Sequence, residues 1–402
     1  MSFKTCIVTG QYPPQLGGVG HSAFRVANML ANRGAEVHIV AFQKHNVPLP
    51  FDESYTSTQE KNVLVHRVKV FNPSGEARNG KSESEVLTRY NREMFDALNF
   101  FQTQFQFDVL HAFFLYPAAY IAGLVGKLHD VKVIASIRGN DVGKYVFDPV
   151  RMPLVKSAMK NADFITSVAT NLIELGDRAV TPISDKSKTI LNSINFDHLA
   201  PKKRPDINVK GTVIGTMGLF RYKKGLVYLC KALGKLKDKY EFTLLLAGDY
   251  FKEEDRKPHL QYFSENGLTD RTIVTGRIPH AEIADYLQLF DIMVFPSLYS
   301  EGCPLSMLEG MAMNKAVIGS TTGAIPEIIQ DRVNGILVPP ASSEHLENAI
   351  TELLENPDLR KQLGDNAGIR VEELSQEKEY GEWLKAYQVV LGKTHDVLVT
   401  SG

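Results

Sequence analysis

The sequence predicts an α/β protein made of two domains, each with a parallel β-sheet covered by helices. The chain has 402 residues, of which 44% are hydrophobic and 23% charged, as is typical of globular proteins. At roughly 150 residues per domain, this length accommodates two or three domains. Short apolar runs rich in β-branched residues alternate with helical patterns, which indicates parallel strands joined by helical crossovers. The alternation starts again after residue 206, which predicts a second sheet.

The predicted elements follow one another in the order that such sheets require. In the first half, a buried strand at 4–9 is followed by an amphipathic helix at 21–33. Further strands are predicted at 36–42, 62–71, 108–111 and 131–136, with a helix at 116–128. In the second half, strands are predicted at 213–217, 242–247, 272–275, 292–296 and 316–319.

A proline-rich polar stretch, 200–206, has the composition of a linker between the two domains. The last predicted helix, 377–391, carries Tyr380, Trp383 and Tyr387 on about one face, which needs an apolar partner surface. We expect this helix to cross back to the first domain. The predicted domains are therefore an N-terminal domain of residues 1–199 plus 378–402 and a C-terminal domain of residues 200–377.

Composition excludes several classes of protein. A net charge of −1 lacks the basic excess that nucleic-acid binding requires. No run approaches the ~20 apolar residues of a membrane span, and the N-terminus has the pattern of a strand rather than of a signal segment. The three scattered cysteines, Cys6, Cys230 and Cys303, do not form the pattern of a disulfide framework, so we expect a cytoplasmic protein.

The most specific motif is a pair of carboxylates, Glu301 and Glu309, that follows the strand at 292–296. Pro304 suits the first turn of a helix, which would carry Glu309 and direct its side chain back toward the Glu301 loop. A helix N-terminus attracts anions, and an ionised glutamate accepts hydrogen bonds from a sugar diol. The pair is therefore suited to a nucleotide sugar. The alternative is a solvated Glu301 and an ion-paired Glu309 on a helix surface.

Two loops could supply a diphosphate site. Arg221 and Lys224 lie in a turn after the strand at 213–217, where they would neutralise phosphate charge; the alternative is an ordinary basic surface turn. A glycine-rich loop, 11–20, follows the first strand and contains Gly17 and Gly18. It fits a dinucleotide fingerprint only formally, because the loop is long and no acidic residue ends the second strand, which disfavours NAD.

These blocks together resemble glycosyltransferase family 4, whose members are retaining nucleotide-sugar transferases of the GT-B fold. The Glu301–Glu309 block is similar to the family's E-x7-E signature, and the segments 322–329, 334–338 and 192–196 are similar to its neighbouring segments. The resemblance covers nearly the whole chain. It implies two Rossmann-like domains that face each other across a cleft, with the C-terminal helix crossing back to the first domain.

The resemblance also implies roles for individual residues. Glu309 would hold the donor ribose and Glu301 would lie beside the donor sugar as a catalytic residue. Arg221 and Lys224 would bind the diphosphate. In many members the arginine directly follows the glycine, whereas here Arg221 comes three residues after Gly218. The remaining donor-binding residues would be backbone groups of Gly17, Gly18, Gly302, Cys303, Pro304 and Leu305.

The first domain departs from the family where members often carry H-x-H. This chain has His111 followed by Phe113, and a phenylalanine cannot donate a hydrogen bond to a sugar. His111 is therefore a catalytic candidate, with a structural histidine at a strand end as the alternative. Arg138 and Asp141 resemble the family's acceptor-side segment; the alternative is an internal Arg–Asp pair that pins the loop.

The expected activity is retaining, metal-independent transfer of a sugar from a UDP-, GDP- or ADP-linked donor to a hydroxyl acceptor in polysaccharide, glycolipid or small-glycoside synthesis. We expect no cofactor and no metal, because the sequence contains no Asp-x-Asp, H-E-x-x-H or paired C-x-x-C motif. Lysines between 223 and 239 would suit weak contact with the inner face of a membrane or the solvated face of a helix. The alternative functions are a non-catalytic nucleotide-sugar sensor, an epimerase and a phosphorylase.

Overall fold

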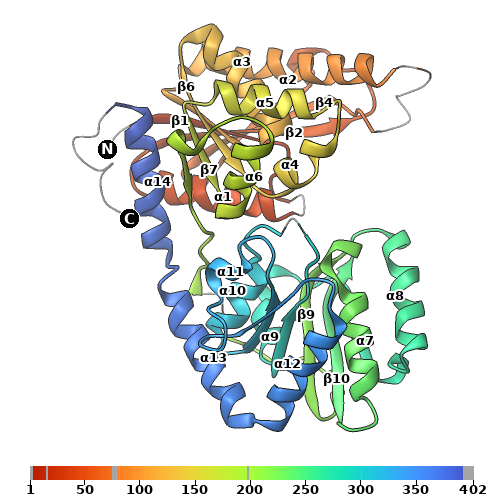
Figure 1. Cartoon of the computed structure of the whole chain (residues 1–402). Coiled ribbons are helices and arrows are strands. Elements are labelled where there is room, and N and C mark those ends of the chain that lie inside the picture. Colours follow the sequence, from red (N-terminus) through yellow and green to blue (C-terminus); the bar gives the residue numbers. More distant parts are fainter. Residues whose placement is uncertain are drawn as a thin grey trace. The chain divides into compact units, whose positions relative to one another are not determined.

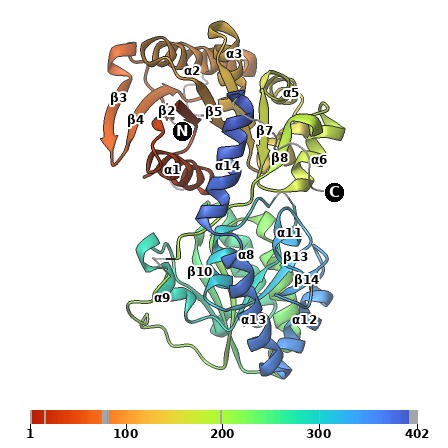
Figure 2. The same ribbon diagram turned by 90° about the vertical axis from the view of Figure 1, so that its left-hand side faces the viewer.

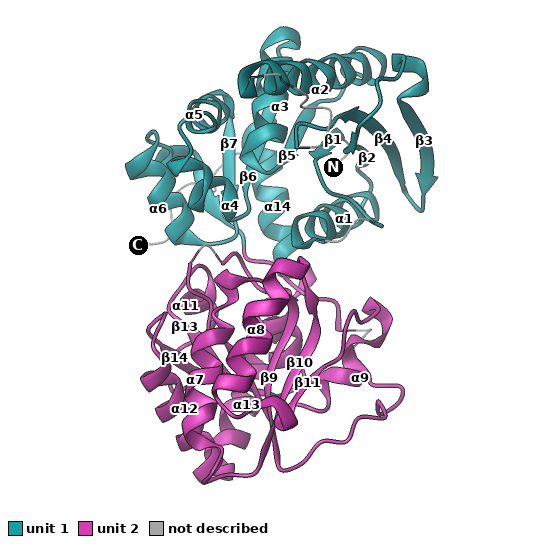
Figure 3. Cartoon of the chain, turned by 90° about the vertical axis from the view of Figure 1, so that its right-hand side faces the viewer, with its two compact units in different colours: residues 1–190, 379–402 teal, residues 191–378 magenta. Residues whose placement is uncertain are grey.

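The computed structural model describes residues 3–14, 17–74, 80, 82–196, 199–299 and 301–392, and the chain divides into two compact units. Unit 1 comprises Met1–Ile190 and Glu379–Gly402, and unit 2 comprises Leu191–Lys378. Figure 1 labels the elements, and Figure 3 colours the two units separately. Unit 2 thus begins at Leu191, ahead of the boundary that the sequence predicts at residue 200.

Unit 1 contains an eight-stranded sheet with the order β3-β4-β2-β1-β5-β6-β7-β8. All neighbouring strands are parallel except the edge pair β3–β4. The sequence did not predict β3, because its residues are mostly exposed and lack apolar alternation. The strands are β1 (Lys4–Thr9), β2 (Glu36–His45), β3 (Tyr55–Glu60), β4 (Val63–Phe71), β5 (Val109–Phe113), β6 (Lys132–Ile137), β7 (Phe164–Ser167) and β8 (Ser187–Thr189).

The C-terminal helix belongs to the core of unit 1. Trp383 and Tyr387 are buried in the same apolar cluster as Ile7, Ile39 and Phe113, and Figure 2 shows α14 against this unit. The expectation that the last helix crosses back to the first domain is confirmed. The helices of this unit are α1 (Gly18–Ala31), α2 (Glu83–Phe105), α3 (Tyr120–His129), α4 (Asn140–Gly143), α5 (Met152–Asn161), α6 (Thr170–Ala179) and most of α14 (Gln376–Val390).

Unit 2 contains a six-stranded, fully parallel sheet with the order β11-β10-β9-β12-β13-β14. Its strands are β9 (Thr212–Phe220), β10 (Phe242–Tyr250), β11 (Thr272–Val274), β12 (Ile292–Phe295), β13 (Ala316–Ser320) and β14 (Ile336–Val338). Its helices are α7 (Leu226–Leu236), α8 (Glu253–Glu265), α9 (Ile283–Leu287), α10 (Leu305–Ala312), α11 (Ile325–Ile328), α12 (Ser343–Glu355) and α13 (Pro357–Glu372). The prediction of two parallel-sheet α/β domains is confirmed.

Helix α7 shows how the sequence pattern places the core of unit 2. Leu226, Leu229 and Leu233 are buried, whereas Lys231 and Lys235 on the same helix are exposed. This is the amphipathic arrangement expected of a helix that packs on a sheet. In the described part of the chain, no helix is long and apolar enough to cross a membrane.

Candidate functional site

Two neighbouring strands of unit 2 bring the predicted charged residues together. β9 pairs with β12, β9 leads into the turn Tyr222–Lys224, and β12 leads into the segment that contains Glu301. The amide of Leu298 donates to the carbonyl of Lys223 at 2.8 Å, which ties the turn to that segment. In parallel sheets the carboxyl ends of strands lie at one edge, where α/β proteins bind ligands.

Gly225 permits this close approach. Its φ is +70°, and a Cβ atom added there would lie 1.9 Å from the carbonyl oxygen of Pro296. A larger residue would therefore be strained by its backbone and would collide with the end of β12. The turn can approach β12, and thereby place Lys224 beside Glu301, only because this position is a glycine.

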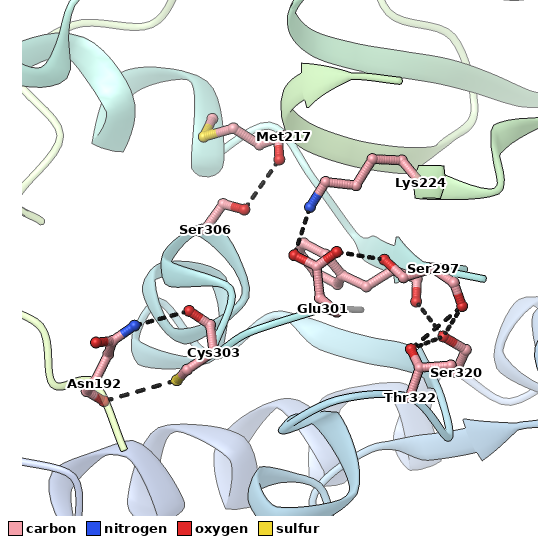
Figure 4. Close-up of polar contacts among 10 residues, drawn as sticks. Asn192, Met217, Lys224, Ser297, Glu301, Cys303, Ser306, Ser320 and Thr322 are labelled. Carbon is pink, nitrogen blue, oxygen red and sulfur yellow. Dashed lines mark hydrogen bonds and ion pairs between the residues drawn. The ribbon is translucent and has the colours of Figure 1, made fainter. Parts of the chain in front are cut away.

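Glu301 is the centre of the charge cluster. Its Oε1 atom lies 2.8 Å from Nζ of Lys224, and its Oε2 atom accepts a hydrogen bond from Oγ of Ser297 at 3.1 Å (Figure 4). Only 7% of the residue is exposed. Burial raises the pKa of Glu301, but the charges of Lys224 and Lys223 and the hydrogen bonds from Lys224 and Ser297 outweigh burial and bring this pKa below its usual value. Glu301 is therefore ionised at neutral pH.

The loop around Glu301 is held by hydroxyl groups from β13 and the residues that follow it. Ser320 Oγ donates to the carbonyl of Ser297 at 2.5 Å, and Thr322 Oγ1 donates to the same carbonyl at 3.3 Å (Figure 4). Gly323 has φ +56°, and a Cβ atom there would lie 1.6 Å from the carbonyl oxygen of Glu301. The backbone at Ser297 and at Glu301 is thus held by these contacts.

The segment after Glu301 leads directly into α10. This helix begins at Leu305, and Pro304 is its N-cap. The sequence predicts Pro304 in the first turn, so the helix begins one residue later than predicted. Cys303 is buried, and its carbonyl accepts a hydrogen bond from Nδ2 of Asn192 at 3.0 Å. Glu309 lies inside α10 and is 5% exposed. The structure therefore places both predicted carboxylates and the intervening residues 302–305 on one loop and helix, and it buries both carboxylates.

Arg221 lies at the start of the same basic turn. It is the N-cap of Tyr222–Lys224, and its guanidinium carbon lies 3.5 Å from the centre of the Phe251 ring. Electrostatic interactions connect Arg221 and Lys223 with Glu301. Sequence reasoning did not select Lys223 or Ser297 for this site. The adjacent lysines gave a signal for Lys223, whereas nothing local marked Ser297.

His111 in unit 1 is fully buried, and both of its ring nitrogens are engaged. Nδ1 lies 2.9 Å from the hydroxyl of Tyr387 on α14, and Nε2 lies 2.9 Å from Oγ of Ser136 on β6. Burial, together with the charge of Arg138, lowers the pKa of His111 to about 3, so the ring is neutral. The geometry favours the structural alternative over the catalytic role predicted for His111, because a substrate would find no accessible ring nitrogen.

Asp141 is also used inside unit 1. Its buried carboxylate accepts hydrogen bonds from the backbone amides of Arg138, Gly139 and Leu115, at 3.0, 2.8 and 3.2 Å respectively. This differs from the predicted acceptor-binding role: the Asp141 carboxylate pins the loop through backbone amides. The guanidinium carbon of Arg138 lies 5.2 Å from the centre of the Phe113 ring.

The other predicted positions in unit 1 begin a helix. Gly17 is the N-cap residue of α1 and Gly18 is its first residue, after the carboxyl end of β1. β1 pairs with β5, and β5 pairs with β6; Gly17 comes after β1, His111 lies within β5 and Arg138 follows β6. Among the residues that the structure describes, no group of three or more His, Cys, Asp or Glu side chains could hold a metal ion.

Comparison with known proteins agrees with this arrangement. The family description "Glycosyltransferase Family 4" matches residues 16–197, and "Glycosyl transferases group 1" matches residues 200–370. A relative named N-acetyl-alpha-D-glucosaminyl L-malate synthase, from Bacillus anthracis, is 25% identical over 94% of this chain and 95% of its own length. An uncharacterized glycosyltransferase of Methanocaldococcus jannaschii is also 25% identical, over 91% of this chain and 93% of its own length.

Solved structures show the same fold. Sucrose-phosphate synthase from Thermosynechococcus elongatus superposes with a TM-score of 0.79 at 19% identity, over 98% of this chain and 100% of that chain. HepE of Anabaena, solved in complex with UDP and glucose, gives a TM-score of 0.75 at 16% identity, over 96% and 99% of the two chains. The family matches define a glycosyltransferase, and the solved structures show that its fold is GT-B. The chain belongs to glycosyltransferase family 4.

Proposed function

We propose that this glycosyltransferase moves a sugar from a nucleoside-diphosphate sugar to a hydroxyl acceptor, with retention of anomeric configuration and without a metal ion. The observation that carries the proposal is the cluster of Arg221, Lys223 and Lys224 around a buried, ionised Glu301. All four residues come from turns at the carboxyl edge of one parallel sheet. This arrangement suits a ligand that carries several negative charges and a neutral polar group.

The cations would bind the donor diphosphate. In glycosyl transfer the diphosphate departs and gains charge, so fixed positive charges stabilise the transition state more than the ground state. Glu309 would hold the ribose hydroxyls, and backbone amides of residues 302–305 would line the donor site. The complex of HepE with UDP and glucose makes UDP-linked sugars the first donors to test.

Glu301 would accept hydrogen bonds from hydroxyls of the donor sugar. Because its pKa lies below the usual value, this carboxylate is a weak base and a stable hydrogen-bond acceptor. We therefore assign deprotonation of the acceptor hydroxyl to the departing diphosphate, on the same face of the sugar. Attack from that face gives the retention of configuration that we propose.

The acceptor would bind at unit 1, for which Arg138 is the remaining candidate side chain. Asp141 would act by holding the Arg138 loop through backbone amides. Gly17 and Gly18, at the N-terminus of α1, would offer backbone N–H groups to the donor phosphates. The acceptor class remains a hydroxyl compound of polysaccharide, glycolipid or small-glycoside synthesis.

A donor screen tests the proposal. Isothermal titration calorimetry with UDP, GDP and ADP identifies the base, and each sugar conjugate of that base is then incubated with the protein in the presence of EDTA. We expect binding of one nucleoside diphosphate, release of that diphosphate from one conjugate, and a product whose anomeric configuration by NMR equals that of the donor. An inverted product, a requirement for metal, or no binding of any nucleotide would contradict the proposal.

A further inference from the structure

We propose that Ser297 is a positioning residue, which retains Glu301 when an incoming diphosphate takes Lys224 away from it. Glu301 and the diphosphate then compete for the same lysine. The inference rests on the proposed function, because it takes Lys224 as a diphosphate ligand. It adds that the resting ion pair opposes donor binding and that a second residue holds the carboxylate once the pair is broken.

The two oxygens of Glu301 have different partners. Oε1 lies 2.8 Å from Nζ of Lys224, and Oε2 accepts the hydroxyl of Ser297 at 3.1 Å (Figure 4). Because Glu301 is only 7% exposed, water cannot readily replace a lost partner. A buried carboxylate that loses one partner is costly unless another donor stays in place. The hydroxyl of Ser297 is that donor.

The two partners differ in mobility. Lys224 carries its charge at the end of a four-carbon stem, so its ammonium group can turn to a phosphate while its backbone stays fixed. Ser297 has a short side chain, and its carbonyl accepts hydrogen bonds from Ser320 and Thr322. The serine hydroxyl is therefore anchored to the sheet edge and remains with Glu301 when the lysine leaves.

The charges around Glu301 indicate that this carboxylate weakens the binding of a diphosphate. Arg221, Lys223 and Lys224 contribute positive charge, and Glu301, together with Asp255 on the side of Arg221, cancels part of it. Removal of this negative charge, with the shape of the side chain kept, should strengthen the attraction for a diphosphate. A variant of a predicted donor-site residue should therefore bind the nucleoside diphosphate more tightly than the native protein.

The test measures dissociation constants by calorimetry for UDP, GDP and ADP, and then uses the one that the native protein binds most tightly. We expect Glu301→Gln to bind it about tenfold more tightly and Ser297→Ala about tenfold more weakly. The double variant should match Glu301→Gln, since a neutral side chain does not need Ser297. Ser297→Thr, which keeps the hydroxyl, should restore native affinity.

Ser342→Ala is the matched control. Its hydroxyl caps α12 by accepting from the amide of His345, so this change also removes one serine hydroxyl from unit 2. We expect it to leave nucleotide affinity unchanged. Thermal unfolding of each variant shows whether it is folded. If Ser297→Ala does not fold, the affinity of Glu301→Gln for the nucleoside diphosphate still shows whether Glu301 opposes binding.

The outcomes separate this inference from the proposed function. If Lys224→Ala binds the nucleotide as well as the native protein, the proposed donor site is wrong. If Lys224→Ala loses binding but Glu301→Gln does not gain it, the site stands and the competition is overturned. If Ser297→Ala weakens binding equally in the native protein and in the Glu301→Gln variant, Ser297 does not act through the carboxylate, and its positioning role is overturned.

Discussion

Both units are α/β units built on a largely parallel sheet, but they use buried polar residues of their strands and loops in opposite ways. In unit 1, His111 gives both ring nitrogens to Tyr387 and Ser136, and Asp141 gives its carboxylate to backbone amides. In unit 2, Glu301 is paired with Lys224, which has a long side chain, and Lys223 also acts on it electrostatically. Polar groups of unit 1 thus stabilise loops and α14, whereas in the proposed donor site of unit 2 Lys224 would exchange Glu301 for a ligand.

The difference shows that position in the fold does not define a functional residue. His111 lies within β5 and Glu301 lies in the segment after β12, and both are buried. They differ in whether each polar atom has a partner that can be replaced without breaking the fold. Variants of unit 2 should therefore change ligand binding more than stability, and variants of unit 1 should do the reverse.

The largest expected effect is on transfer by unit 2. Lys224→Ala and Glu309→Ala should each lower the rate of sugar transfer about ten- to a hundredfold, because a charge-assisted contact to the donor contributes ~1.5–3 kcal/mol. Transfer is measured as release of nucleoside diphosphate from the donor that the screen identifies. Native-like turnover of both variants would contradict the assignment of the donor site to unit 2.

Acid should weaken unit 1 more than unit 2. Burial lowers the pKa of His66 to about 4 and of His111 to about 3, and it also lowers the pKa of His38; in unit 2, burial lowers the pKa of His259. Unfolded histidine titrates near pH 6.5, so below that pH the unfolded state binds protons that the folded state does not. This stability is fully present above pH ~6.5 and is lost as the pH falls.

From pH 7.5 to 5.5, His66 and His111 together should cost about 2–3 kcal/mol of the free energy of unfolding. The single tryptophan, Trp383, lies in the core of unit 1, so its fluorescence in urea titrations reports this unit. His66→Gln should flatten the pH dependence of the fluorescence transition. If this variant showed the same pH dependence as the native protein, His66 would not contribute to the loss of stability in acid.

Loss of the His111 contacts should destabilise unit 1 without a change in nucleotide affinity. His111→Phe keeps an aromatic ring but leaves the hydroxyls of Tyr387 and Ser136 without their histidine partner, which should cost about 2 kcal/mol. Trp383 fluorescence in urea measures the loss, and calorimetry measures the affinity of the folded variant. A variant with native stability and impaired transfer would return His111 to the catalytic residues.

The smallest effects come from a matched pair of helix caps. Ser82 forms a capping box with Glu85 at the start of α2 in unit 1, and Ser342 caps α12 in unit 2. Replacement of either serine by alanine should cost about 1 kcal/mol. Trp383 fluorescence should register the Ser82 change only, whereas far-UV circular dichroism should register both. A fluorescence response to Ser342→Ala would show that the units unfold together.

The fold could be predicted from local pattern because buried parallel strands are continuous apolar runs. β1 has the predicted bounds, and most other predicted strands were placed with their ends shifted by a few residues. β3, β7 and β8 were missed: β3 is an edge strand whose exposed side chains carry no apolar signal, and β7 and β8 are only four and three residues long. The pairing of β3 with β4 is antiparallel, so the sheet of unit 1 is not wholly parallel.

The candidate site could be predicted only in part. Glu301, Glu309 and Lys224 were found because acidic and basic residues follow strands in a spacing that a known family shares. Ser297 was missed because a serine just after a strand is common, and the role proposed for it rests on its 3.1 Å contact with Glu301. The alternatives for His111 could not be separated, since its partner Tyr387 lies 276 residues away in the sequence.

The sequence by itself determined the two parallel α/β units, the return of the last helix to the first unit and the family, because apolar periodicity and motif spacing are local properties of the chain. Only the tertiary structure decided which polar groups are already satisfied inside the protein. It gave both nitrogens of His111 and the carboxylate of Asp141 internal partners. It placed the ammonium group of Lys224 against one oxygen of Glu301. The physical reason is that a polar group's availability depends on partners that packing brings from distant segments, and no local pattern records them.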